Sequence, residues 1–202
     1  HYKKLYMHEE VSYWDNISKW LYEDRNRIKV KRCLDIGCGY GTLLLLAQKI
    51  YGCSIYGMDL TNSFISNKLI KKYGMDFKIC NVETDIIPWA YNFDLIFLTE
   101  VIEHFNFNVE PTLIKIREKL SDNGILYLST PDAKWYGKIT DYYKTYKDMP
   151  PARKDLPIKD CHIYVFDEHE LMELFDSVGF KIEKYGQTYG HHLNFKLKKG
   201  WS

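Results

Sequence analysis

Residues 34–42 read LDIGCGYGT and place three alternating glycines directly after an apolar run. The run at residues 30–36 is predicted to be a buried strand, and residues 42–50, behind the glycines, are predicted to be a helix. Glycine permits a sharp turn and lets a ligand approach the backbone where a Cβ atom would collide. A strand, a tight turn and a helix in this order predict a ligand crevice at the carboxyl end of the strand.

Two carboxylates accompany the glycine turn and limit the kind of ligand that it can hold. Asp59 ends the second predicted strand, where an acidic side chain can accept hydrogen bonds from ribose hydroxyls. Asp35 directly precedes the glycines, and a pyrophosphate would repel its charge whereas a cationic group would favour it. The glycine spacing is GxGxG and not the GxGxxG of dinucleotide sites. These features favour S-adenosylmethionine (SAM), with its ribose and positive charge, over a nicotinamide or flavin dinucleotide or a turn without a ligand.

Strand-like and helix-like segments alternate along most of the chain, which predicts an α/β, Rossmann-like fold: a mostly parallel twisted sheet with helices on both faces. The predicted strands lie at residues 30–36, 54–58, 76–80, 93–98, 125–129, 180–185 and 193–197, with a turn at 122–124. The predicted helices lie at residues 5–24, 42–50 and 61–73, after the cap residue Asn108, and after Asp167.

We expect one domain of 202 residues, because this length fits a single core. Within it, residues 1–29 are interpreted as an N-terminal helical cap and residues 30–130 as the SAM-binding core. Residues 131–162, rich in proline and tyrosine, interrupt the alternation and are interpreted as a lid or acceptor insertion. Residues 163–202 return to a helix and strands.

The composition excludes several classes of protein. Lysine and arginine total 28 against 27 acidic residues, so the net charge of +1 argues against a globally basic nucleic-acid-binding protein. The longest apolar run, residues 43–47, is too short to span a membrane. The five cysteines lack CxxC spacing and are expected to be reduced thiols of a cytoplasmic protein. No metal site is expected, since adjacent histidines at 191 and 192 would point to opposite faces of an extended chain.

Six segments, in the same order as in the family, resemble the class I SAM-dependent methyltransferases. They are LDIGCGYG, IYGMDLT, CNVETDIIP, FDLIFLTEVIEHF, LSDNGILYLSTPD and CHIYVFDEHELMELFDSVGF. The resemblance runs from residue 33 to about residue 180 and is closest to the subgroup that includes methyltransferases of quinone and cell-surface sugar biosynthesis. It implies the seven-stranded sheet of this class and SAM as the cofactor, with S-adenosylhomocysteine (SAH) as the product.

The resemblance also implies roles for individual residues. The turn glycines Gly37, Gly39 and Gly41 would pack against the methionine and ribose parts of SAM. Asp35 would hold the amino group, and Asp59 the ribose hydroxyls. The adenine and the methyl group would be bounded by Met58 or Leu60, Asn81, Val82, Thr99 and Glu100. Asn81 stands where the family usually has an aspartate, and a neutral amide can still bond the adenine amino group.

Methyl transfer to a hydroxyl requires alignment of the acceptor and a base for its proton. Glu100, Glu103 and His104 directly follow the fourth predicted strand, and His162 follows the lid. His104, His162 and Glu100 are the candidate catalytic residues. Glu100 and His104 are expected at the rim of the crevice, and His162 matches a histidine that the family resemblance implies near the acceptor. A histidine is suited to accept a proton near neutral pH.

The lid carries slightly more cationic than anionic residues, which hints at an anionic small-molecule acceptor. We therefore expect O-methylation of a sugar, a phosphorylated or nucleotide-linked sugar, or a cell-surface polysaccharide precursor. Aromatic residues between lysines would also suit single-stranded RNA. An RNA or protein methyltransferase and a non-catalytic SAM-binding protein therefore stay open as alternatives, and the oligomeric state is left undetermined.

Overall fold

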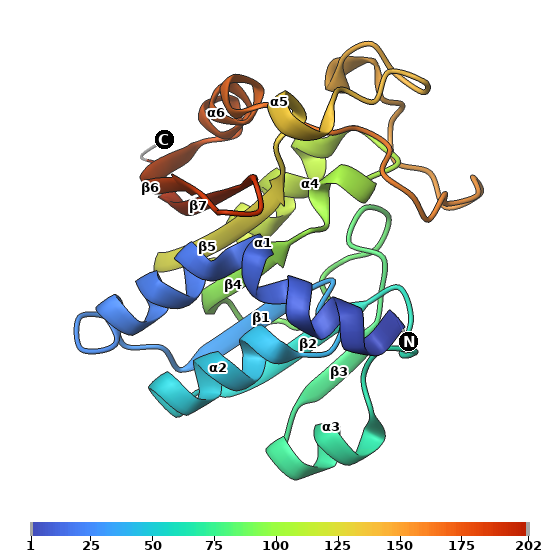
Figure 1. The fold of residues 1–202 in the computed structure, drawn as a ribbon. Helices are drawn as coiled ribbons and strands as arrows, with labels where there is room; N and C mark the ends of the chain where they lie inside the picture. The colour runs from blue at the N-terminus through green and yellow to red at the C-terminus, as the bar shows by residue number, and fades with distance from the viewer. Residues whose placement is uncertain (1, 201–202) are drawn as a thin grey trace.

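The computed structural model describes the backbone of residues 2–200 and the side chains of residues 10 and 12–200. It contains a seven-stranded sheet with the strand order β3-β2-β1-β4-β5-β7-β6 (Figure 1). The strands are β1 Arg32–Ile36, β2 Ser54–Asp59, β3 Asp76–Ile79, β4 Phe93–Thr99, β5 Leu120–Pro131, β6 Phe180–Gln187 and β7 His192–Lys199. The pairings among β1 to β5 are parallel, and β7 is antiparallel to both β5 and β6. The predicted Rossmann-like fold is confirmed.

Helices cover both faces of this sheet. The longer ones are α1 Tyr2–Asp24, α2 Thr42–Tyr51, α3 Asn67–Tyr73, α4 Val109–Glu118 and α6 Glu168–Ser177. The short helical turns are η1 Ile102–His104, α5 Ala133–Tyr136 and η2 Tyr146–Asp148. No helix within residues 2–200 is both long and apolar enough to cross a membrane.

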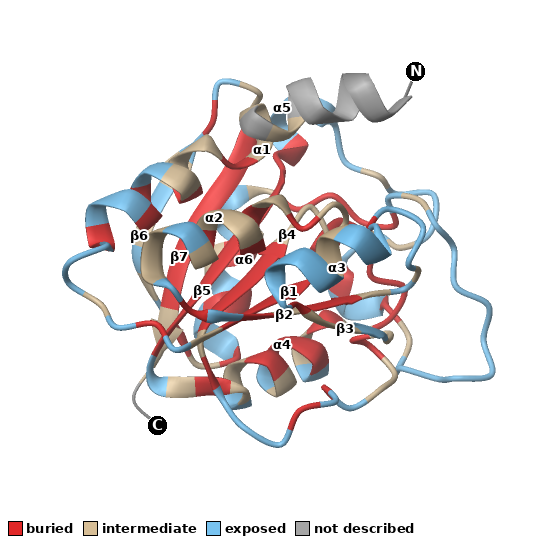
Figure 2. Cartoon of the chain, turned by 90° about the horizontal axis from the view of Figure 1, so that it is seen from below, coloured by how far each residue is buried: buried red, intermediate tan, exposed pale blue. Residues whose placement is uncertain are grey.

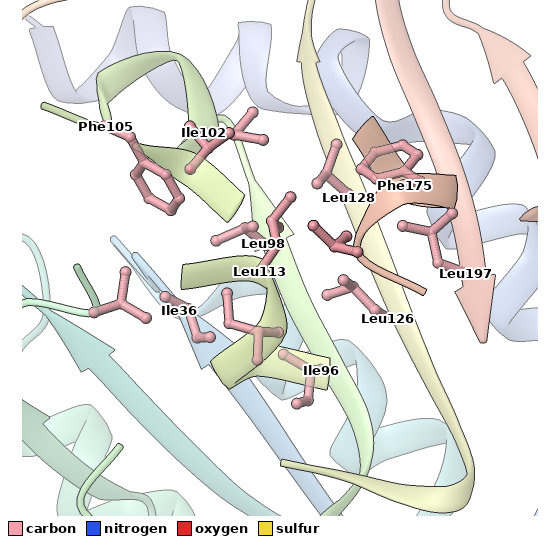
Figure 3. Close-up of a cluster of buried hydrophobic side chains, with 14 of the residues drawn as sticks. Ile36, Ile96, Leu98, Ile102, Phe105, Leu113, Leu126, Leu128, Phe175 and Leu197 are labelled. Atoms are coloured by element: carbon pink, nitrogen blue, oxygen red, sulfur yellow. The ribbon is translucent and has the colours of Figure 1, made fainter. Parts of the chain in front are cut away.

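The core consists of two apolar clusters, one on each face of the sheet, because successive residues of a strand point to opposite sides. Residues of α1 and α2 form one cluster with odd-numbered positions of β4 such as Leu95 and Phe97. Residues of α4 and α6 form the other with Ile96 and Leu98 (Figure 3). The sheet between them is largely buried, whereas the helices present exposed outer surfaces (Figure 2). The central strands are thereby held rigidly, and so are the turns at their ends.

Two predicted boundaries are wrong for local reasons. The predicted turn at residues 122–124 lies inside β5, where the pairing with β4 jumps from Leu120 opposite Phe93 to Ile125 opposite Leu95. The extra residues of β5 are accommodated as an irregularity within the strand. The helix predicted at 61–73 begins only at Asn67, because hydroxyl groups upstream hydrogen-bond to the backbone and to each other and compete with the helix.

The segment interpreted as a lid, residues 131–162, forms long loops at the edge of the molecule, coloured yellow to orange in Figure 1. It is fastened at several points. Tyr146 and Met149 are buried in the α4 and α6 cluster. The carbonyl of Pro150 accepts a hydrogen bond from the backbone N–H of Asn108 at 2.8 Å. These contacts hold the segment against the loop that follows β4.

Candidate active site

The glycine turn has the backbone geometry that the sequence predicts. Gly37, Gly39 and Gly41 all have positive φ, at 72°, 49° and 75°. A Cβ atom on Gly37 would lie 2.4 Å from Cγ2 of Val101, so a larger residue there would collide. The backbone N–H of Gly39 donates to Asp59 Oδ2 at 3.0 Å, which ties the turn to the end of β2.

A cleft of about 210 Å³ opens beside this turn, at the carboxyl ends of β1, β2 and β4. Six of the predicted cofactor-binding residues line it: Gly37, Gly39, Asp59, Leu60, Asn81 and Val82. Glu100 and His104 line the same cleft, together with the end of the lid, residues 158–160. The structure thus brings together residues from five separate parts of the chain.

A smaller hollow of about 20 Å³ adjoins the cleft and shares Gly37, Gly39 and Glu100 with it. The predicted residues Asp35 and Thr99 line this hollow. Gly41 lines neither space. Instead it precedes α2, where a Cβ atom would lie 3.2 Å from Cε of Met75, so this glycine makes room for protein packing.

Asp35 is the most unusual residue of the smaller hollow. It is 3% exposed, and its Oδ1 atom has no hydrogen-bond partner within the described residues. Burial raises the pKa of this carboxyl group well above its usual value, and the nearby Asp59 and Glu10 raise it further. A cationic ligand group would offset this unfavourable environment, because an unpaired buried charge is costly.

Glu10 of α1 also lines the smaller hollow and was not predicted. Its Oε2 accepts a hydrogen bond from Thr42 Oγ1 at 3.0 Å, and burial raises the pKa of its carboxyl group. Three residues with carboxyl groups, Glu10, Asp35 and Glu100, therefore line one small space. No local motif marks Glu10, because the approach of α1 to α2 depends on tertiary packing alone.

Across the cleft, the polar groups of the adenine-side residues are arranged by neighbouring backbone. Asn81 Oδ1 accepts from the N–H of Glu83 at 2.9 Å. Glu83 is itself buried and accepts from the N–H groups of Asn106 and Phe107 at 3.1 and 2.8 Å. Leu60 is 52% exposed at the rim, and Val82 is buried beneath it in the wall.

Glu100 lies at the floor shared by the two spaces and has a positive φ of 55°, rare for a residue other than glycine. Ser129 Oγ donates to its Oε1 at 2.7 Å, and Nδ1 of His192 lies 2.8 Å from its Oε2. Burial raises the pKa of Glu100 to about 8, and burial lowers the pKa of His192 to about 4. Both partners are thus neutral near pH 7.

Of the other catalytic candidates, His104 lines the cleft, and His162 lies behind it without lining either space. His104 lies in η1, and its ring centroid is 4.7 Å from that of His162 at the end of the lid. Burial lowers the pKa of His104, and His162 lowers it further. Partial burial also lowers the pKa of His162. Both imidazoles are consequently neutral near pH 7 and able to accept a proton.

The sequence matches a family model described as a methyltransferase domain over residues 7–185. The chain belongs to this methyltransferase family. A SAM-dependent methyltransferase from Clostridium acetobutylicum has the same fold, with a TM-score of 0.71 and 12% identity over 99% of this chain and 98% of that one. A 1,6-didemethyltoxoflavin-N1-methyltransferase from Burkholderia thailandensis, solved with SAH bound, aligns with a TM-score of 0.65 and 17% identity over 98% of this chain and 88% of that one.

A curated relative is more similar in sequence but over a shorter stretch. It is the sphingolipid C9-methyltransferase of Candida albicans, 30% identical over 109 residues, which are 47% of this chain and 20% of the relative. The methyltransferase described here therefore matches about a fifth of that protein. The chain therefore belongs to a methyltransferase-domain family and has the fold of SAM-dependent methyltransferases of known structure.

Three features of the methyltransferase site escape sequence reasoning. Glu10 comes from α1, His192 from β7, and Phe64 stands at the cleft beside Leu60. The isolated positions of Glu10 and Phe64 give no signal. His192 has a weak sequence signal, because it is adjacent to His191. The two side chains point to different surroundings, with His192 buried and His191 stacked on Trp135.

Proposed function

We propose that this methyltransferase transfers the methyl group of SAM to a small-molecule acceptor, which enters the cleft from the side of the lid. The observation that carries the proposal is the unpaired, buried carboxylate of Asp35 beside the bare backbone of the glycine turn. A ligand with an ammonium group next to a sugar satisfies both features. SAM is such a ligand.

The cofactor would extend from the smaller hollow into the cleft. Its ammonium group would lie at Asp35, and Asp59 would accept from the ribose hydroxyls. The adenine would lie between the side chains of Leu60 and Val82, with Asn81 at its edge. This placement follows the chemistry of the lining residues. Carboxylates line the end where the ammonium and the ribose would lie, and apolar side chains line the end where the adenine would lie.

The methyl group would then face the cleft wall formed by Glu100 and His104. The sulfonium is an activated leaving group, so the protein has to align an acceptor atom and exclude water. We assign the proton of a hydroxyl acceptor to the cluster of His104 and His162, whose imidazoles are neutral and lie within reach of the cleft. Glu100 would support this wall through its bonds to Ser129 and His192.

For the acceptor we propose a hydroxyl compound such as a sugar or polysaccharide precursor. Lys159 and Asp160 line the mouth of the cleft and offer partners to a polar acceptor. The exposed side chain of Ile158 lies beside them, and the partial relative acts on a sphingolipid, so a lipid acceptor is the competing class.

The test is an assay of SAH release against a panel that contains sugars, nucleotide-linked sugars, sphingolipids and oligoribonucleotides. SAM binding is measured in parallel by calorimetry. Turnover with a sugar supports the proposed acceptor. Turnover with a lipid or with RNA instead would show that the acceptor belongs to that class. Tight SAM binding without turnover on any acceptor would favour the reading as a non-catalytic SAM-binding protein.

A further inference from the structure

Glu103, His104 and His162 bring one carboxylate and two imidazoles to a single point. Each offers one ligand atom, and these atoms all lie within 4.8 Å of one another. The backbone fixes this grouping, because the carbonyl of Glu103 accepts hydrogen bonds from the N–H groups of Ile163 and Tyr164 at 2.7 and 3.2 Å. The end of the lid is thereby attached to η1 with His162 beside His104.

Glu103 provides a second, independent sign of a ligand. Its side chain is buried, with 1% of the residue exposed, and is the least exposed of the three. Thr130 Oγ1 donates to Oε2 at 2.9 Å, while Oε1 has no hydrogen-bond partner within the described residues. A buried carboxylate oxygen without a partner is unfavourable unless a cation or a proton satisfies it.

The donor set determines which cation fits. Two imidazole nitrogens and one carboxylate oxygen suit zinc, manganese or iron in the divalent state, whereas magnesium and calcium prefer all-oxygen sites. Ligand atoms on a tetrahedral ion lie about 3.3 Å apart, so the three groups would need to close by up to roughly 1.5 Å. The exposed His162 on the lid has room for that movement.

We propose that Glu103, His104 and His162 bind a divalent transition-metal ion at the wall of the cleft. Three protein ligands leave at least one coordination position open, as in catalytic zinc sites. His104 lines the cleft, so the open position would be reached from the space beside the methyl donor. Binding of the ion is independent of the reaction, whereas its role in catalysis rests on the proposed function.

In that role the ion would bind the oxygen of the acceptor hydroxyl and make its proton more acidic. The proton passes to solvent, and the oxygen attacks the methyl carbon. The bond from sulfur to carbon breaks with its electron pair remaining on sulfur, which leaves neutral SAH. With the ion bound, the imidazoles act as its ligands, so they would take the acceptor proton only in the metal-free protein.

The test uses the full chain, freed of metal by a chelator and titrated with Zn²⁺ by calorimetry and with Co²⁺ by visible absorption. We expect one equivalent to bind and the Co²⁺ spectrum to report nitrogen ligands. His162→Ala should weaken Zn²⁺ binding by at least about 100-fold, since even indirect partners of metal ligands are worth 10–100-fold. The control is His169→Ala, because His169 is also exposed but pairs only with Glu173.

Equal Zn²⁺ affinity of the wild type and the His162→Ala variant would overturn the proposal. Glu103→Gln and His104→Ala should give the same loss as His162→Ala, with an unchanged circular dichroism spectrum and a cooperative thermal unfolding transition as the check that each variant is folded. If SAH fails to bind the wild type while Zn²⁺ binds, the proposed function fails and the metal site stands. If SAH binds the wild type and Zn²⁺ does not, the proposed metal site fails and the proposed function stands.

Discussion

Asp35 destabilises the ligand-free protein, and we propose that it binds the ammonium group of the cofactor. Its carboxyl group is buried, lacks a partner for Oδ1, and has a raised pKa. In the Asp35→Asn variant the charge is gone, so we expect a ligand-free protein at least as stable as the wild type and SAH affinity lower by about tenfold or more. Thermal unfolding and calorimetry measure the two effects. Asp176→Asn, at an exposed position of α6, is the control and should change neither.

Gly37 is required for two separable reasons, its positive φ and its contact with Val101. Gly52 also has a positive φ, 64°, but nothing lies within 4 Å of a Cβ atom there. We expect Gly52→Ala to lower the free energy of unfolding by about 1 kcal/mol, the cost of the left-handed conformation, and Gly37→Ala to lower it by more. Urea unfolding measures both. Adding Val101→Ala to Gly37→Ala should recover part of the loss, and equal effects of the two alanines would contradict a collision at Gly37.

At the level of elements, Asn106 fastens the end of the lid to the loop after η1. Its Oδ1 accepts from the N–H of Lys159 at 2.9 Å, and its Nδ2 donates to the carbonyls of Lys159 and His104 at 3.2 and 2.9 Å. Removing these bonds in Asn106→Ala should free residues 155–162 and cost about 1–3 kcal/mol. Faster amide hydrogen exchange confined to this segment is the expected measurement. Unchanged exchange there, with loss of stability elsewhere, would mean that the lid is held by its apolar anchors.

Most elements could be predicted from the sequence because local chemistry determines them. Gly74 ends α3 in the left-handed conformation, Asn108 caps α4, and Asp167 forms a capping box with Glu170 at α6. The two wrong boundaries arise where non-local pairing or side-chain hydrogen bonds override local preference. The irregularity in β5 depends on its pairing with β4, so the sequence of β5 alone cannot predict it.

The site divides in the same way. Residues at the carboxyl ends of β1 and β2 and on the turn after β1, such as Asp35, Asp59 and Gly37, could be predicted because each lies within a recognisable local pattern. Glu10 and His192 could not, because they reach the site through the packing of α1 and β7 onto the sheet. The grouping of Glu103 and His104 with His162 escaped the search for metal-ligand spacing for that reason as well: the third residue is distant in the chain.

Across the whole molecule, close polar contacts run from the cleft to the exposed side chain of Tyr136 in α5. Ser129 donates to Glu100, and Oε2 of Glu100 lies 2.8 Å from Nδ1 of His192. Nε2 of His192 lies 3.1 Å from the hydroxyl of Tyr136, which donates to the carbonyl of Gly190 at 2.8 Å. These contacts connect the end of β4 with β5 and β7. The residues below the site therefore also contribute to the stability of the domain.

The shifted pKa values of Glu100 and His192 predict how the stability of the protein depends on pH. The pKa of Glu100 is raised to about 8, so the folded protein keeps the proton that the unfolded chain releases above about pH 4.5, and stability falls as the pH rises towards 8. His192, with its pKa lowered to about 4, acts in the opposite direction only below about pH 6.5. Between pH 6.5 and 8 Glu100 should contribute about 2 kcal/mol to the fall, and Asp35 and Glu103, whose carboxyl pKa values burial also raises, add to it. Glu100→Gln stays neutral and retains a donor, so its urea unfolding free energy should lose the part of the fall that belongs to Glu100. The matched control, Glu173→Gln on the exposed face of α6, should retain it. A wild-type curve that is flat or rising over this range would mean that Glu100 is ionised in the folded protein.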